Sequence, residues 1–255
     1  MVVLHGAGVD HREPEACFEP ILERVPGVRR IYPDLPGMGR SPAPESLHSS
    51  DDVLHLLLDF VHAECGRERF WLVGHSWGGY LAREMAARAP DQVAGLALVC
   101  PVLAGDHDVP EHRVAVGSGD LGDEVFRDYF VVQTPQMLDR YTRYVAPSAA
   151  LVDDEAIERI SENWGLSLAA APYPGPMLVV AGRSDSTVGY AGAVELLEVH
   201  PRATVIVIDD AGHALPHEQP ELLDALIRHW LARTDGSVAP PRGPRVGSAT
   251  QASGT

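Results

Sequence analysis

Short apolar runs alternate with stretches of helical periodicity along most of the chain. The runs that predict strands cover residues 2–4, 28–32, 70–73, 93–102, 177–181 and 204–208. Helical patterns cover residues 14–25, about 49–65, 80–88, 191–199 and about 220–232. Strands that alternate with helices form a mainly parallel sheet covered on both faces. We therefore expect an α/β fold with a doubly wound sheet.

One long segment interrupts this alternation. Residues 104–172 have helical periodicity without a strand signal, and they contain 13 Asp and Glu against 5 Arg. We expect this segment to be a helical lid inserted into a core formed by residues 1–103 and 173–233. Residues 234–255, rich in Gly, Pro, Ser, Ala and Thr, have too few large apolar groups to pack and are expected to form a disordered tail.

Charge and composition exclude several classes of function. The formal net charge is −16, which disfavours binding to nucleic acid and to anionic membrane surfaces. All 20 basic residues are Arg, so the chain can form neither a lysine Schiff base nor the lysine contact of a phosphate-binding loop. We expect a small-molecule substrate and no cofactor.

The three cysteines are widely spaced, and no His or Cys spacing indicates a metal site. The chain begins with neither a basic segment nor a long apolar run, and no apolar stretch reaches the length of about 18 residues needed to span a membrane. We therefore expect a cytoplasmic protein with reduced thiols and no metal.

A serine between glycines follows one of the predicted strands. Residues 70–73 lead directly into Gly74-His75-Ser76-Trp77-Gly78-Gly79, and a helical pattern follows. A serine at such a strand-to-helix turn is exposed at the carboxyl end of the sheet, and its backbone is strained. Gly74 and Gly78 supply room that side chains would fill. The pattern predicts that Ser76 is a nucleophile.

A nucleophilic serine needs a base and a carboxylate that orients the base. The predicted strand at residues 177–181 is followed by Asp185, and the strand at 204–208 is followed by His213. Serine, acid and histidine in this order, each after a strand, are typical of one architecture. Asp209 and Asp210 lie nearer to His213 in sequence, but we interpret them as a solvated turn.

Five motifs in this order resemble the α/β-hydrolase-fold proteins over residues 1–233. They are His-Gly-Ala-Gly at 5–8, Asp-Leu-Pro-Gly-Met-Gly-Arg-Ser at 34–41, Gly-His-Ser-Trp-Gly-Gly at 74–79, Gly-Arg-Ser-Asp at 182–185 and Ala-Gly-His at 211–213. Dehalogenases and epoxide hydrolases of this fold are similar, but they carry aspartate where this chain has Ser76. The resemblance implies a serine hydrolase of the esterase or proline iminopeptidase-like branch.

The resemblance also implies a role for each site residue. Ser76 would be the nucleophile, His213 the general base and Asp185 the orienting acid. The backbone N–H groups of Trp77 and Ala7, with Gly8 as the less favoured alternative to Ala7, would form the oxyanion hole.

Three other histidines compete for a role at the site. His217 lies one helical turn after His213, and we expect it at the surface or rim of the molecule. His5 and His75 are expected to act as hydrogen-bonding scaffold.

The aromatic residues of the predicted lid favour an apolar substrate pocket. We expect Trp77, Tyr129, Tyr144 and Trp164 to contact substrate. The expected reaction is cleavage of an ester, lactone or thioester of a small, largely apolar molecule through an acyl-enzyme. Aminopeptidase activity of the proline iminopeptidase type and a non-hydrolytic binding or biosynthetic role are the alternatives.

The start of the chain departs from the family pattern. Members usually carry two strands before the strand that precedes His-Gly, whereas that strand here begins at Val2. We expect six strands, no hairpin before Val2, and an exposed edge at residues 28–32. A homodimer through this edge is one expectation.

Overall fold

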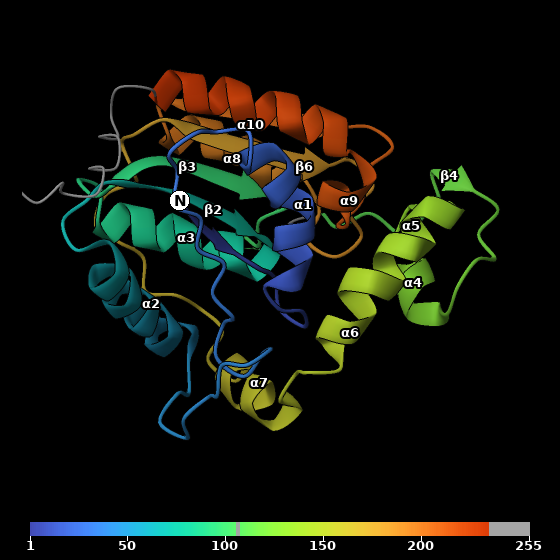
Figure 1. Ribbon diagram of the computed structural model, residues 1–255, viewed down its shortest axis with the longest axis horizontal. Helices are drawn as coiled ribbons and strands as arrows, with labels where there is room; N and C mark the ends of the chain where they lie inside the picture. The colour runs from blue at the N-terminus through green and yellow to red at the C-terminus, as the bar shows by residue number, and fades with distance from the viewer. Residues whose placement is uncertain (106–107, 235–255) are drawn as a thin grey trace, which may run out of the picture.

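The computed structural model describes residues 1–105 and 108–234, and its centre is a parallel sheet of five strands (Figure 1). The strands are β1 (Val2–Leu4), β2 (Phe70–His75), β3 (Val93–Val99), β6 (Met177–Gly182) and β7 (Ala203–Ile208), and they lie in this spatial order. Every neighbouring pair is parallel. This confirms the predicted mainly parallel sheet.

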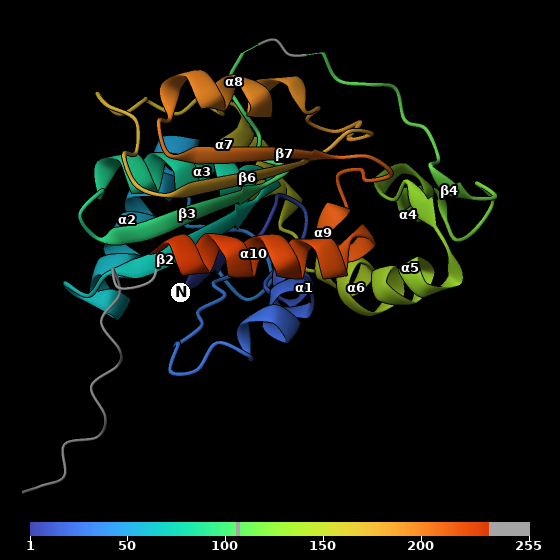
Figure 2. The ribbon, with the colours of Figure 1, turned by 90° about the horizontal axis from the view of Figure 1, so that it is seen from above.

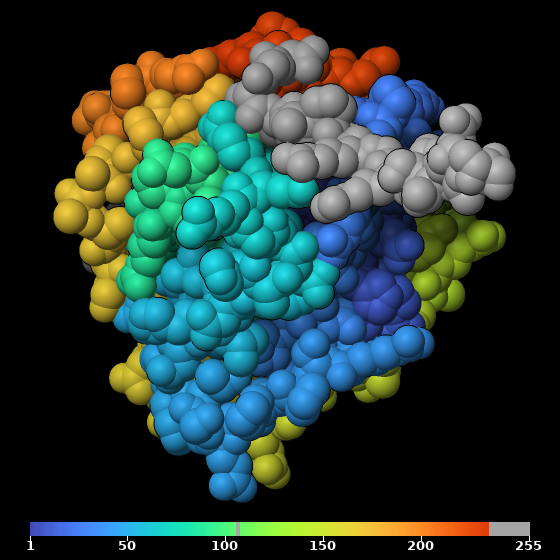
Figure 3. All heavy atoms as spheres, turned by 60° about the vertical axis from the view of Figure 1, so that its left-hand side comes forward, coloured from blue at the N-terminus to red at the C-terminus, as the bar shows by residue number. Residues whose placement is uncertain are grey.

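Helices cover both faces of the sheet (Figure 2). One apolar layer joins the sheet to α2 (Ser50–Cys65), α3 (Ser76–Arg88) and α8 (Ala191–Val199). The other joins it to α1 (Arg12–Leu22) and α10 (Pro220–Thr234). Figure 3 shows the face on which the early part of the chain, from blue to cyan, forms most of the surface. The doubly wound arrangement follows from strands that are apolar on both sides, such as the fully buried β3.

The strand predicted at residues 28–32 is reduced to one bridge. The N–H of Val3 donates to the carbonyl of Ile31, and the N–H of Ile31 donates to that of Met1. The prediction of six strands was wrong because the partner, β1, is only three residues long and offers no longer ladder. Within residues 1–105 and 108–234, no further strand covers this edge. Dimerisation through it stays a prediction.

Residues 108–172 lie between β3 and β6 and are called the insertion; they consist of short helical segments joined by loops. They form α4 (Glu124–Tyr129), α5 (Pro135–Arg140), a π-helical turn (Tyr141–Val145), α6 (Ala146–Ala149) and α7 (Asp154–Ser161). Two short parallel strands, β4 (Val116–Gly117) and β5 (Val132–Gln133), were not predicted. Two residues are too few to show the alternation of a strand.

The insertion has a small apolar core of its own. Three aromatic residues of the predicted lid, Phe126, Phe130 and Tyr141, fill this core, and Val9 and Ala214 from outside the insertion complete it. Its buried members are Val9, Phe126, Phe130, Met137, Tyr141, Val145 and Ala214. Helices α4, α5 and α6 stand beside α1 and α9 (Leu215–Glu218) at one end of the sheet, whereas α7 lies apart from them (Figures 1 and 2).

Helix ends agree with the sequence signals in part. Either Ser49 or Ser50 could cap α2 on sequence alone, and in the structure Ser49 does so by accepting from the N–H of Asp52. Helix α3 begins at Ser76 instead of Tyr80, because the glycines at 78 and 79 are accommodated in its first turn. Helix α10 includes Thr234, so the predicted tail begins one residue too early. The rest of the predicted disordered tail, residues 235–255, lies outside the described residues.

Gly78 lies where α3 packs closely against the backbone of Leu4 and His5, and its substitution tests this packing. A methyl group there would overlap the carbonyl oxygen of His5, so we expect Gly78→Ala to lower the free energy of unfolding by about 3 kcal/mol or more. Gly165→Ala is the matched control, because a methyl group at Gly165 meets no atom within 4 Å. Chemical denaturation measures both variants. Equal stability of Gly78→Ala and the wild type would contradict the packing described.

Candidate active site

Ser76 lies at the sharp turn between β2 and α3. Its backbone φ is +54°, a left-handed conformation that is strained for a serine. A methyl group on Gly74 would overlap the carbonyl oxygen of Gly78, and one on Gly78 would overlap that of His5. The predicted strain at Ser76, and the need for glycine at both flanking positions, are confirmed.

Two further loops bring a histidine and a carboxylate to Ser76. The Oγ of Ser76 lies 2.9 Å from Nε2 of His213, and Nδ1 of His213 lies 2.9 Å from Oδ2 of Asp185. Asp185 follows β6, and His213 follows β7. Ser76 is 8% exposed, His213 6% and Asp185 0%. The structure therefore assembles a buried serine, histidine and carboxylate in one hydrogen-bonded chain.

The second oxygen of Asp185 is also engaged. Its Oδ1 accepts from the backbone N–H groups of Thr187 at 2.9 Å and Val188 at 3.0 Å. Burial by itself would raise the pKa of Asp185, but His213 and these hydrogen bonds outweigh it and lower the pKa. Asp185 is therefore an anion at neutral pH. An anionic Asp185 can accept a hydrogen bond from an Nδ1–H of His213, and in that tautomer Nε2 is the acceptor that faces the Ser76 hydroxyl.

The competing acids lie elsewhere. Asp209 and Asp210 are exposed in the turn after β7, and Asp210 has φ of +49°. The side chain of Gln219 donates to the carbonyl of Asp210, which stabilises this turn. Their interpretation as a solvated turn agrees with these positions.

The segment His5-Gly6-Ala7 passes directly beside Ser76. A methyl group on Gly6 would lie 3.0 Å from Cβ and 3.5 Å from Oγ of Ser76. The N–H of Trp77 belongs to the first turn of α3, where helix N–H groups have no partner within the helix. The structure thus brings the backbone of Trp77 and the segment before Ala7 to the same side chain.

The aromatic residues expected to bind substrate occupy different places. The Trp77 ring is 1% exposed, stacks on Trp164 with centroids 5.2 Å apart, and donates through Nε1 to Oγ of Ser50. The rings of Trp77 and Trp164 therefore pack with α2 in the apolar layer under the sheet. The Tyr129 ring meets the ring of His213 edge-on at 6.0 Å, so Tyr129 does lie at the candidate site.

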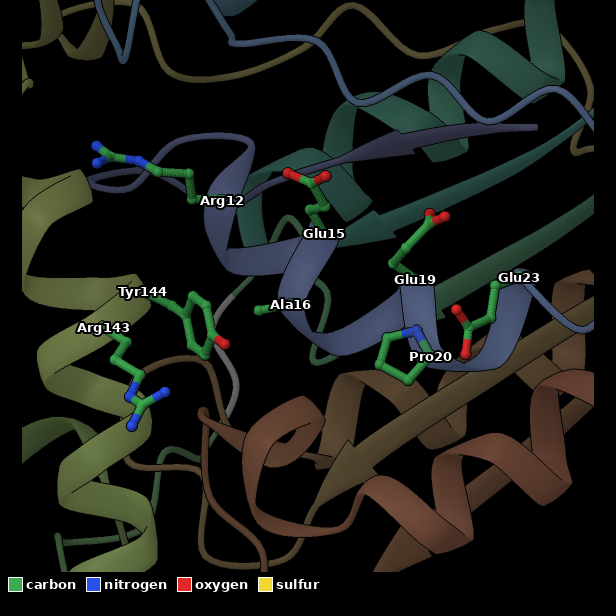
Figure 4. A pocket seen from close by; sticks show the side chains of 8 residues that line it. All are labelled: Arg12, Glu15, Ala16, Glu19, Pro20, Glu23, Arg143 and Tyr144. Carbon is green, nitrogen blue, oxygen red and sulfur yellow. The ribbon is translucent and has the colours of Figure 1, made fainter.

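Tyr144 lies away from Ser76, in a groove between α1 and the π-helical turn. Figure 4 shows its ring directed at the side of α1 that carries Ala16. The guanidinium of Arg140 lies 5.8 Å from the centre of this ring. The structure does not bring Tyr144 to the serine, histidine and carboxylate.

His217 is buried, which contradicts the expectation of a surface or rim position. Its exposed fraction is 0%, because α9 packs against α1 and α5. Nε of Arg140 donates to Nδ1 of His217 at 3.0 Å, and Nε2 of His217 lies 3.5 Å from Oε1 of Glu13. His217 is thus held in a buried polar cluster and does not contact Ser76.

The two scaffold histidines behave as expected. His75 places its Nε2 3.0 Å from the carbonyl oxygen of His213, and His5 accepts from the N–H of Leu35 at 2.8 Å. The sequence reasoning missed two buried acids beside them. Glu13 lies 3.7 Å from Nδ1 of His75, and Glu218 accepts from the N–H of Gly212. Each is a single Glu shortly before a predicted helix, at a position where the sequence pattern gives no signal of burial.

Two groups of side chains place potential metal ligands within 4.8 Å of one another. They are His75, Cys100 and His213, and Asp10, His11 and Asp34. Both ring nitrogens of His213 are already engaged by Ser76 and Asp185. The oxygens of Asp34 are engaged by His11 and by the N–H of Arg40. These hydrogen bonds account for both groups as parts of the loop framework.

Asp10 gives the structure a specific acid sensitivity. Burial opposes its ionisation, but Arg12 and the Ser148 hydroxyl lower the pKa of Asp10 to about 2. An unperturbed aspartate has a pKa of about 3.9, so Asp10 stabilises the fold above about pH 4 and this contribution is lost as the pH falls towards 2.

We expect Asp10→Asn to show a weaker pH dependence of the free energy of unfolding between pH 4 and 2 than the wild type. The exposed Asp91→Asn is the control and should follow the wild type. Denaturant titration across this range is the measurement. Parallel curves for Asp10→Asn and the wild type would refute the assignment.

The fold and the site together define a protein with a serine, histidine and carboxylate at the carboxyl edge of a mainly parallel sheet. A family model described as the alpha/beta hydrolase family matches residues 1–226. The chain therefore belongs to the alpha/beta hydrolase family. Within the described residues, no helix is long and apolar enough to cross a membrane.

Similar proteins have diverse activities. The chain is 28% identical to the biotin biosynthesis bifunctional protein BioHC of Cellvibrio japonicus, covering 90% of this chain and 47% of that one, so it spans about half the length of this relative. It is 29% identical to the 2-succinyl-6-hydroxy-2,4-cyclohexadiene-1-carboxylate synthase of Salmonella newport, covering 89% and 92%.

Solved structures share the fold. An alpha/beta superfamily hydrolase from Oenococcus oeni superposes with a TM-score of 0.84 at 29% identity, covering 91% of this chain and 92% of that one. A thermophilic esterase from Thermogutta terrifontis has a TM-score of 0.64 at 21% identity, covering 91% and 89%. The second likeness shows the fold alone.

Proposed function

We propose that the protein is a serine hydrolase that cleaves an ester, lactone or thioester of a small, largely apolar substrate through an acyl-enzyme on Ser76. The observation that carries this proposal is the continuous chain from Ser76 Oγ to His213 Nε2 and from His213 Nδ1 to Asp185, with 2.9 Å at each step. This is the geometry that nucleophilic catalysis by a serine hydroxyl requires.

Each residue has a defined step in the proposed reaction. As the Ser76 oxygen bonds to the carbonyl carbon, its proton passes to Nε2 of His213, and the carbonyl π electrons move to the oxygen. The N–H groups of Trp77 and Ala7 would stabilise this oxyanion. When the oxyanion collapses, the bond to the leaving group breaks and His213 returns the proton to that group. Water then attacks the acyl-enzyme while His213 takes its proton. The bond to the Ser76 oxygen breaks, His213 returns the proton to this oxygen, and the acid is released.

The surroundings of His213 support an apolar acyl group. The Tyr129 ring lies edge-on to His213, and Val131 packs against Gly212, so that a methyl group on Gly212 would lie 2.8 Å from Cγ1 of Val131. Apolar walls with few polar groups are usual for pockets that bind small apolar molecules. The low exposure of Ser76 and His213 favours a compact substrate.

A substrate panel tests the proposed bond class. The purified protein would be assayed against p-nitrophenyl esters of increasing acyl length, lactones, thioesters and amino-acid arylamides. We expect short esters or thioesters to be cleaved with the highest kcat/KM. Faster cleavage of amino-acid arylamides would instead support an aminopeptidase of the proline iminopeptidase type.

A second candidate is a synthase that uses the same three residues without transferring an acyl group to water. The similarity to a synthase across 92% of that protein favours it. The two candidates differ in one result. A Ser76 that reacts with a fluorophosphonate in a protein that hydrolyses no compound of the panel would favour the synthase.

A further inference from the structure

Glu218, the last residue of α9, joins the histidine loop to the insertion. Its Oε2 accepts from the N–H of Gly212 at 2.7 Å. Its Oε1 accepts from the N–H groups of Val131 at 2.7 Å and Val132 at 3.0 Å. The side chain is buried, with 8% of the residue exposed. One carboxylate therefore satisfies three backbone donors from two segments that are far apart in sequence.

The same two segments meet through their side chains. Tyr129 packs its ring against the ring of His213, and Val131 packs against the backbone of Gly212. Phe130 lies between these residues in the chain, and its ring centre is 5.7 Å from that of His217. Residues 129–132 of the insertion thus form a continuous contact with the chain from Gly212 to His217. The Glu218 carboxylate is the polar link within it.

The backbone of Gly212 and His213 is held by a side chain at each of these two residues. Glu218 binds the N–H that precedes His213, and His75 lies 3.0 Å from the carbonyl oxygen of His213 itself. The orientation of the His213 ring toward Ser76 depends on where this short stretch of backbone lies. A shift of about 1 Å in a catalytic group can lower a rate about 100-fold.

We propose that Glu218 is a positioning residue, which sets His213 against Ser76 and makes that position depend on residues 129–132 of the insertion. The proposal rests on the proposed hydrolase function. A carboxylate can accept from all three N–H groups, whereas the amide of glutamine has one acceptor oxygen and would turn its NH₂ group toward some of these donors. Burial raises the pKa of Glu218, and the three N–H groups oppose this rise.

The test compares Glu218→Gln with Glu221→Gln, an exposed glutamate in the first turn of α10. The rate of reaction with a fluorophosphonate would be measured over a range of probe concentrations. We expect Glu218→Gln to lower the maximal rate by about 10- to 100-fold, because proton transfer to a displaced His213 is slower. The half-saturating concentration should change by less than about threefold, and Glu221→Gln should behave as the wild type in both.

Circular dichroism at the assay temperature would show that Glu218→Gln is folded. If it is not, Glu218→Asp takes its place, because it keeps the charge but is one methylene too short to reach both segments. We expect Glu218→Asp to react more slowly than the wild type, again with little change in the half-saturating concentration. A folded Glu218 variant with the wild-type maximal rate would overturn the positioning role and leave the proposed function standing. No reaction of the wild type would overturn both.

Discussion

Replacing Ser76 by alanine is expected to lower kcat for the best ester substrate by about 10⁴-fold or more, because residues of such an array act as a unit. Among the described residues, the Ser76 hydroxyl is the only side-chain group hydrogen-bonded to Nε2 of His213. No other described side chain is therefore placed to act as the nucleophile in its absence. The small residual rate would come from substrate binding and the backbone N–H groups. Steady-state kinetics on purified protein measures the effect.

Ser161→Ala is the matched control for this variant. Ser161 is exposed on α7, and its hydroxyl donates to the carbonyl of Glu158 in the same helix. We expect its kcat to equal that of the wild type. Equal ester cleavage by Ser76→Ala and the wild type would show that another residue performs the reaction.

Replacing Asp185 by asparagine is expected to lower kcat by about 10⁴-fold. The Thr187 and Val188 N–H groups would hold the amide oxygen at the place of Oδ1, which turns the NH₂ group toward His213. Nδ1 of His213 would then have to accept a hydrogen bond, and its proton would move to Nε2. In that tautomer His213 cannot take the proton of Ser76.

Asp209→Asn tests the same substitution at the exposed acid nearer to His213 in sequence, and it should leave kcat within about twofold of the wild type. Kinetics of both variants with one ester, together with the melting temperature, separates catalysis from folding. A large loss in Asp209→Asn with little loss in Asp185→Asn would reverse the assignment of the acid.

Much of the fold could be predicted because its central strands are apolar on both faces. The runs that became β2, β3, β6 and β7 are clear in the sequence, and the helices between them show a regular apolar face. The strand expected at 28–32 failed because strand formation depends on the partner, and β1 offers only three residues. The pair β4 and β5 is too short for any periodicity to show.

The candidate site could be predicted because loops at the carboxyl ends of parallel strands meet at one edge of the sheet. Ser76, Asp185 and His213 each follow such a strand, so they meet at this edge although long segments separate them in the sequence. The direction of a side chain follows no such rule. Whether the Trp77 ring lines a pocket or stacks on Trp164, and whether His217 is exposed, depend on packing between distant helices.

Mass spectrometry of the protein after reaction with a fluorophosphonate would identify the nucleophilic residue. Attack by Ser76 forms an oxygen–phosphorus bond as fluoride leaves, so we expect one adduct per chain, on the peptide that contains Ser76. The adduct should be absent from Ser76→Ala. An adduct on a different residue, or an unmodified Ser76 in folded protein, would contradict the assignment of Ser76 as the nucleophile.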